Sequence, residues 1–140
     1  MYVGVTGTSS ENEAVMERNT IRIRKAFALL DPTKHKIVTG ACIGVDALAA
    51  RIAKELGFKV LTIVPANRSK VDPQWRDFCD ESIEMQAGTD YRARNDLLVH
   101  HSELLLAFPS GWWLNPRSGE SMTVNIAKRR GVPVQICAEE

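Results

Sequence analysis

The chain has 140 residues, of which 44% are hydrophobic and 25% are charged. These proportions are ordinary for a globular protein and exclude intrinsic disorder. The length predicts a single domain over residues 1–140. Eighteen basic residues nearly balance 17 acidic residues and leave a net charge of +1. General electrostatic attraction to nucleic acid or to an anionic membrane is therefore not expected.

The sequence favours a cytoplasmic protein that does not enter a membrane. Its longest apolar runs, such as residues 104–109, are far shorter than the ~20 residues that span a bilayer. The N-terminus lacks the pattern of a signal peptide. Cys42, Cys79 and Cys137 form neither a disulfide framework nor a zinc pattern. No pair of histidines stands at ligand spacing with a carboxylate, so no metal site is expected.

Short apolar runs alternate with longer amphipathic stretches along the chain. Strands are predicted at residues 2–6, 36–39, 58–64, 104–108 and 132–136. Helices are predicted over residues 11–30, 45–56 and 120–130, and from Thr89 as N-cap through His101. The stretch between residues 66 and 88 is the least clear. One interpretation is a helix that starts at Asp72-Pro73, carries Ile83 and ends at Gly88.

Strands separated by helices predict a single Rossmann-like α/β domain of three layers. A mostly parallel sheet of about five strands would have helices on both faces. Such sheets bind ligands beyond the carboxyl ends of their strands, where the strand order reverses. Residues that come directly after each strand are therefore the candidates for a functional site.

The second predicted strand runs through a glycine-containing turn into a helix, as Val-Thr-Gly-Ala-Cys-Ile-Gly-Val-Asp over residues 38–46. Gly40 allows a tight turn, and Gly44 lets a ligand approach a helix N-terminus, where amides and the helix dipole favour a phosphate. This is neither the dinucleotide fingerprint nor the lysine-containing phosphate loop. The alternative is that both glycines only permit the turn. Asp46 is either a first-turn carboxylate or an acceptor for a ribose hydroxyl or a base edge.

Two further loops carry small polar residues. Gly7, Thr8 and Ser9 follow the first predicted strand, although such clusters are also common in simple turns. The loop after the strand at 104–108 leads through Ser118 and Gly119 into another helix. It is a second candidate for an anion cradle.

Three blocks of the sequence resemble the SLOG superfamily of Rossmann-like domains. They are VTGACIGVDALAARIAKELG, YRARNDLLVHHSELLLAFP and SGESMTVNIAKRRGVPVQI. The superfamily includes the DprA/Smf recombination mediators, the YspA-like and YpsA-like proteins, and the LOG "lysine decarboxylase-like" phosphoribohydrolases. The similarity is greatest to DprA-like and YspA-like members and covers the chain from Val3 to Ile136.

The resemblance implies a nucleotide or nucleotide-derived ligand at the carboxyl edge of the sheet, in a sensing or nucleotide-processing role. No obligatory cofactor is expected, apart from a nucleotide or nucleoside phosphate as ligand. It implies that Arg94 pairs with a phosphate and that Asn95 fixes the loop or contacts the sugar. Without the resemblance, both would be interpreted as part of a solvated helix face. The remaining implied ligand-binding residues, from the first block and the last, are Gly40, Ala41, Gly44, Asp46, Pro109, Ser118, Gly119 and Thr123.

Two other functions stay open, and with them the question whether the protein is an enzyme. One is a DprA-like module that binds single-stranded DNA, for which the nearly balanced charge is unfavourable. The other is a LOG-like hydrolase that cleaves the N-glycosidic bond of a nucleoside 5′-monophosphate. In that family a glutamate assists cleavage, and here Thr123 stands in its place. Glu120 is the candidate substitute and Asp46 the second candidate.

The resemblance also implies that the domain forms a homodimer or a higher homo-oligomer. Trp75, Trp112 and Trp113 lie in segments that need not all fit one small core. Because tryptophan is enriched at the centres of protein interfaces, at least one of them is expected in the contact.

Overall fold

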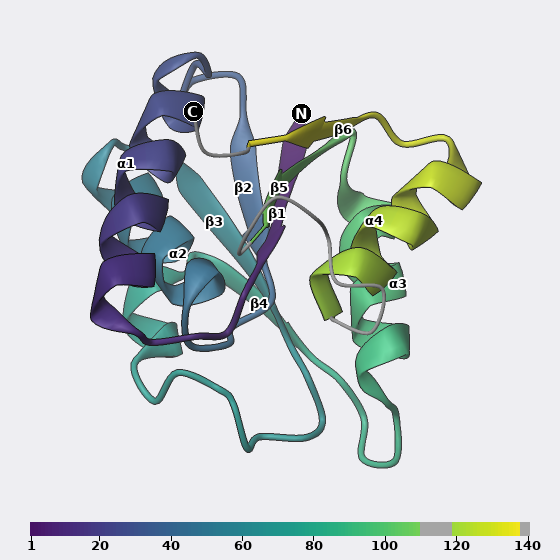
Figure 1. Cartoon of the computed structure of the whole chain (residues 1–140). Coiled ribbons are helices and arrows are strands. Elements are labelled where there is room, and N and C mark those ends of the chain that lie inside the picture. Colours follow the sequence, from purple (N-terminus) through teal and green to yellow (C-terminus); the bar gives the residue numbers. More distant parts are fainter. Residues whose placement is uncertain (110–118, 138–140) are drawn as a thin grey trace.

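A sheet of six parallel strands lies between two pairs of helices (Figure 1). The structure is a computed structural model that describes residues 1–109 and 119–137, except for the side chains of residues 119–121. The strands are β1 (Tyr2–Gly7), β2 (Lys36–Thr39), β3 (Lys59–Val64), β4 (Glu81–Glu84), β5 (Leu104–Phe108) and β6 (Val134–Ile136). The helices are α1 (Glu13–Ala28), α2 (Val45–Glu55), α3 (Tyr91–His101) and α4 (Gly119–Arg130), with a short 3₁₀ helix η1 (Trp75–Phe78). The expected Rossmann-like α/β fold is confirmed.

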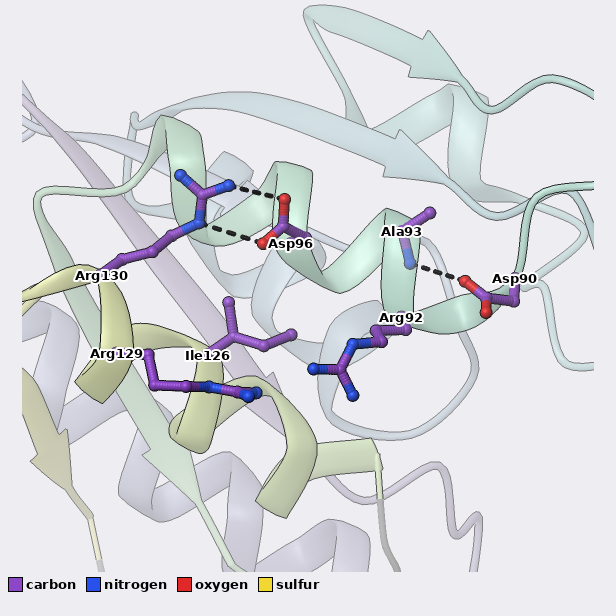
Figure 2. A pocket seen from close by; sticks show the side chains of 7 residues that line it. All are labelled: Asp90, Arg92, Ala93, Asp96, Ile126, Arg129 and Arg130. Carbon is purple, nitrogen blue, oxygen red and sulfur yellow. Dashed lines mark hydrogen bonds and ion pairs between the residues drawn. The ribbon is translucent and has the colours of Figure 1, made fainter.

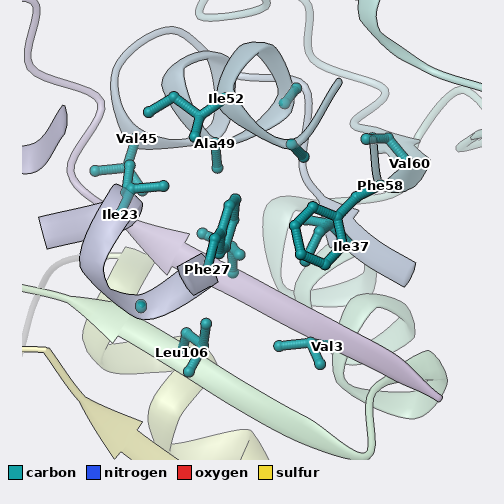
Figure 3. Close-up of a cluster of buried hydrophobic side chains, with 14 of the residues drawn as sticks. Val3, Ile23, Phe27, Ile37, Val45, Ala49, Ile52, Phe58, Val60 and Leu106 are labelled. Atoms are coloured by element: carbon teal, nitrogen blue, oxygen red, sulfur yellow. The ribbon is translucent and has the colours of Figure 1, made fainter. Parts of the chain in front are cut away.

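Two hydrophobic clusters, one on each face of the sheet, hold the layers together. Helices α1 and α2 pack on one face, where Phe27 and Phe58 meet with ring centroids 5.6 Å apart (Figure 3). Helices α3 and α4 pack on the other face, where Leu98 and Val124 are buried among strand residues. Side chains of a strand alternate between faces, so Val3 and Val5 of β1 both belong to the α1–α2 cluster.

The strand order is β4-β3-β2-β1-β5-β6. From β1 the chain adds strands outward to β4, then crosses back along α3 to place β5 on the other side of β1. Gly7, the last residue of β1, is in register with Phe108, the last residue of β5. The order therefore reverses between β1 and β5, and the carboxyl ends of these two strands lie side by side.

The expected helix over residues 72–88 is wrong. In its place the chain forms η1 and then the edge strand β4, in which Ile83 is in register with Ile63 of β3. The carboxylate of Asp80, just before β4, accepts hydrogen bonds from the Val60 amide at 2.8 Å and from Lys54 at 2.9 Å. These contacts fix the segment against β3, so the sheet has one strand more than the five expected.

Two helix starts also differ from expectation. The Asp90 carboxylate, rather than Thr89, caps α3 by accepting from the Ala93 amide at 2.8 Å. The Asn12 side chain caps α1, which therefore begins two residues later than expected. No helix in the described residues is long and apolar enough to cross a membrane.

We expect Phe27→Ala to lower the free energy of unfolding by about 3–5 kcal/mol, because it empties a fully enclosed site against Phe58. Leu29→Ala is the matched control, since Leu29 follows the same helix and is 81% exposed; its effect should stay within about 0.5 kcal/mol. Urea unfolding measures both. Equal effects of the two substitutions would contradict the assigned core.

We expect Asp80→Asn to remove a pH-dependent part of the stability. Burial raises the pKa of Asp80, but Lys54, the Val60 amide and Lys59 together outweigh it and hold the pKa below its usual value. A lowered carboxyl pKa stabilises the fold above about pH 4 and loses this contribution as the pH falls through the folded-state value.

The difference between the wild type and Asp80→Asn should therefore be about 1 kcal/mol at pH 7, a figure reduced for the partial exposure of the side chain. It should vanish near pH 2. Urea unfolding between pH 2 and pH 7 measures it, with the exposed Asp77→Asn as the control. A difference that does not change with pH would contradict the assignment.

Candidate functional site

The loop after β1 lies directly against the N-terminus of α2. The amide of Val45 donates to the carbonyl of Thr8 at 2.9 Å. Gly44 has a φ of +84°, and a Cβ there would lie 2.8 Å from the Cα of Ser9, so the position requires glycine for both reasons. No side chain caps the start of α2. Its first turn is therefore a cluster of backbone amides beside the β1 loop.

The turn after β2 is braced from a distant part of the chain. Ala41 adopts the left-handed conformation with a φ of 69°, which a glycine would take more easily. Its carbonyl accepts from the amide of Asp72 at 2.9 Å, and the amide of Ile43 donates to the carbonyl of Lys70 at 2.8 Å. Ala41 is also buried with Trp75. The segment before η1 thus holds the turn in a conformation that the sequence alone disfavours.

Arg94 of α3 reaches under the same turn. Only 7% of the residue is exposed. Its Nη1 donates to the carbonyl of Gly40, and its Nε donates to the side-chain oxygen of Asn95 at 2.8 Å. The alternative that these two residues form part of a solvated helix face is wrong, because both are buried. Arg94 links α3 to the end of β2.

Asp46 of α2 approaches the turn from the other side. Its Oδ2 accepts from the amide of Cys42 at 3.2 Å. A Cβ at Gly40 would lie 2.8 Å from both Asp46 Oδ2 and Arg94 Cζ, so Gly40 leaves just enough room for the two charged groups. Burial is the largest influence and raises the pKa of Asp46 above its usual value, although the Arg94 charge and the amides of Cys42 and Gly40 act against it. Through its bond to the Cys42 amide, the Asp46 side chain helps to hold the turn.

Cys42 is a buried thiol between these two groups. Burial and the nearby Asp46 charge raise its pKa, against the effect of Arg94 at 3.8 Å from its sulfur. Because the thiolate is the nucleophilic form, a raised pKa makes this cysteine unreactive. It contributes packing to the turn.

On the β5 side of the site, the structure describes Pro109 and helix α4. The Pro109 carbonyl accepts from Arg22 Nη1 at 2.8 Å, a link from α1 that no sequence motif indicated. Asn95 Nδ2 contacts the sulfur of Met122 at 3.6 Å, and Thr123 is 2% exposed in α4. Gly119 is the first residue of α4. Ser118 and the side chain of Glu120 lie outside the described part of the structure.

The carboxyl edge of the sheet thus brings together most of the residues that the sequence singled out. Gly7 contacts the same first turn of α2, since a Cβ there would lie 2.6 Å from the Val45 side chain. The described residues hold no group of three or more His, Cys, Asp or Glu placed to bind a metal. Nine of the residues predicted from the sequence lie at the ends of β1 and β2, in the loops that follow them or beneath those loops. They are Gly7, Thr8, Ser9, Gly40, Ala41, Gly44, Asp46, Arg94 and Asn95.

Of the three tryptophans considered for an oligomer contact, the structure describes only Trp75. Trp75 is 7% exposed and packs against Ala41 and Val64 within the domain. Trp112 and Trp113 lie outside the described residues. Packing within one subunit accounts for Trp75.

Comparison with known proteins identifies the fold. No protein-family model matches the sequence, and no curated protein matches it. DNA processing protein A (DprA) from Streptococcus pneumoniae matches with a TM-score of 0.73 and 18% identity, over 96% of this chain and 49% of that chain. DprA from Helicobacter pylori, described as binding single-stranded DNA, matches with a TM-score of 0.67 and 17% identity, over 97% and 64%. A Moco carrier protein from Chlamydomonas reinhardtii matches with a TM-score of 0.69 and 20% identity, over 99% and 76%.

These matches show the Rossmann-like α/β fold that the sequence resemblance implied. The chain spans 49% and 64% of the two DprA chains. At such identities the likeness extends to the fold alone.

We expect Arg94→Met to destabilise the protein by about 2–4 kcal/mol, because it leaves the Gly40 carbonyl and Asn95 without their donor. Arg92→Met, two residues away on the exposed side of α3, is the matched control and should cost less than about 0.5 kcal/mol. Chemical unfolding measures both variants. An Arg94 variant as stable as the control would show that the link under the turn is unimportant.

Proposed function

We propose that the protein binds a nucleotide or nucleotide-derived ligand at the carboxyl edge of the sheet, with its phosphate against the loops after β1 and β2. The observation that carries this proposal is the uncapped first turn of α2, which abuts the backbone of Thr8 and Ser9. The Val45 amide is bonded to the Thr8 carbonyl, but no side chain caps the amides that follow it, and these amides with the positive end of the helix dipole favour an anion. The position next to the strand-order reversal is where sheets of this type bind ligands.

The roles of the charged residues follow from their contacts. Asp46 in the first turn of α2 would oppose an anion, but its carboxylate is folded against the Cys42 amide and faces the Arg94 charge. Arg94 balances this negative charge from beneath. In the proposal it positions the Gly40 turn and supplies a positive field, because Nη1 and Nε are already bonded within the protein.

A second candidate function is the binding of single-stranded DNA. The match to DprA from Helicobacter pylori, a protein described as binding it, favours this function. The net charge of +1 is unfavourable, because nucleic-acid binding depends largely on phosphate neutralisation.

Glycosidic hydrolysis has less support. It needs an accessible carboxylate near the ribose. Thr123, in the place of the family's glutamate, is buried and carries no carboxylate. Of the two candidate carboxylates, that of Asp46 is bonded to the Cys42 amide, and the side chain of Glu120 lies outside the described residues. We therefore propose binding without cleavage at this edge.

We expect at least one member of a panel of nucleoside mono- and diphosphates, cyclic nucleotides and nucleotide sugars to bind in calorimetric titration. Ser9→Asp should weaken that binding at least tenfold, because it adds a negative charge beside the proposed phosphate position. Ser9→Asn, of the same shape but neutral, should retain most of it. No binding across the panel, or equal affinity in the two variants, would contradict the proposed site.

Titration of an oligonucleotide without terminal phosphates at two salt concentrations distinguishes the second candidate. Tight binding that falls steeply with salt, with no response to any mononucleotide, would replace the first proposal by the second. Incubation with nucleoside 5′-monophosphates should release no free base.

A further inference from the structure

A hollow of about 330 Å³ lies between α3 and α4, apart from the carboxyl-edge site (Figure 2). The helical period of α3 explains why Arg92, and not Arg94, lines this hollow. Arg92 and Arg94 are two residues apart and so project about 200° apart around a helix of 3.6 residues per turn. Arg94 is buried under the Gly40 turn, whereas Arg92 is exposed and lines the hollow. We call this hollow the α3–α4 groove; it is lined by Asp90, Arg92, Ala93, Asp96, Ile126, Arg129 and Arg130.

The two carboxylates of the groove are already used. Asp96 accepts two hydrogen bonds from Arg130, at 3.0 Å from Nε and 2.6 Å from Nη2. This contact, the largest influence, holds the pKa of Asp96 below its usual value. Asp90 caps α3 through the Ala93 amide at 2.8 Å. Asp96 is therefore paired with Arg130, whereas Asp90 caps the helix and keeps its negative charge at one end of the groove.

The guanidinium groups of Arg92 and Arg129 are not used in this way. Arg92 from α3 and Arg129 from α4 extend over the groove from opposite helices (Figure 2). Within the described residues, neither makes a hydrogen bond or an ion pair with a side chain. Both residues are exposed. With Arg130 bound to Asp96, the groove retains two fork-shaped donor groups beside the N-terminal turn of α3.

The floor between these arginines is apolar. Ile126 is 4% exposed and lies beside Arg129 on the side facing Arg92, and Ala93 also lines the groove (Figure 2). A volume of this size fits a small molecule rather than a folded partner. Guanidinium groups bind phosphate through paired N–H donors, and an apolar floor suits the carbon skeleton of an ester.

We propose that the α3–α4 groove is a second ligand site, which binds the phosphate of a small phosphate ester between Arg92 and Arg129. The site is independent of the proposed carboxyl-edge site, because it uses the opposite face of α3. A ligand bound here would bridge α3 and α4, the two helices that carry Asn95 and Thr123 on their buried sides.

The test is a titration of the ¹⁵N-labelled protein with inorganic phosphate and then with ribose 5-phosphate, at constant ionic strength. We expect saturable shifts of the Arg92 and Arg129 Nε–H signals and of the amides at the start of α3. The double variant Arg92→Gln/Arg129→Gln should bind at least tenfold more weakly. Lys128→Gln, which removes an exposed charge of α4 outside the groove, should bind as the wild type does.

The residues whose NMR signals shift distinguish the groove site from the proposed carboxyl-edge site. Ser9→Asp should leave the shifts at Arg92 and Arg129 unchanged, and the double arginine variant should leave nucleotide binding at the first turn of α2 unchanged. Shifts that do not saturate, or that persist in the double variant, would overturn the groove site. Binding of an oligonucleotide without terminal phosphates in the groove, with no binding of ribose 5-phosphate, would overturn its assignment to a small ester.

Discussion

The contact between the Arg94 guanidinium and the carbonyl of Gly40 is the interaction on which the candidate site depends. It joins α3, on one face of the sheet, to the turn at the end of β2. On the other side of Gly40, Asp46 of α2 accepts from the Cys42 amide. Two opposite charges, both removed from bulk water, thus hold one glycine turn between the two helical layers. Removing the Arg94 guanidinium would leave the Gly40 carbonyl and the Asn95 side chain without their donor, which is costly in a buried position.

The topology explains why this turn can serve a ligand. The strand order reverses between β1 and β5, and the carboxyl edge at such a reversal is where sheets of this type bind ligands. That loop meets the N-terminus of α2 through Val45 and Gly44. On the β5 side, Arg22 of α1 holds the carbonyl of Pro109. In both links a helix contacts the end of a strand that does not directly precede it in the chain. Together these contacts set the geometry of the carboxyl edge.

Much of the fold follows from sequence pattern, because the central strands are continuous apolar runs and the helices are amphipathic. The strand β4 was missed because Glu-Ser-Ile-Glu at a sheet edge has only one apolar residue, and pairing with β3 and the Asp80 contacts decide its conformation. The glycine turn and Asp46 were recognisable from spacing. The burial of Arg94 was not, because arginine is mostly exposed in proteins and only the packing of α3 on the sheet shows which side of this helix faces the Gly40 turn. The Arg22 contact with Pro109 joins residues 87 positions apart and leaves no local signal.

The central claim is that the turn held by Arg94 and Asp46 presents the first turn of α2 to a nucleotide phosphate. The most direct measurement is a crystal structure of the protein with a nucleoside phosphate that stabilises it. The account predicts phosphate density within hydrogen-bond distance of the amides at the start of α2 and of the loop after β1, with the Arg94 contact to Gly40 intact. Density for the nucleotide elsewhere, with this edge of the sheet empty, would contradict it.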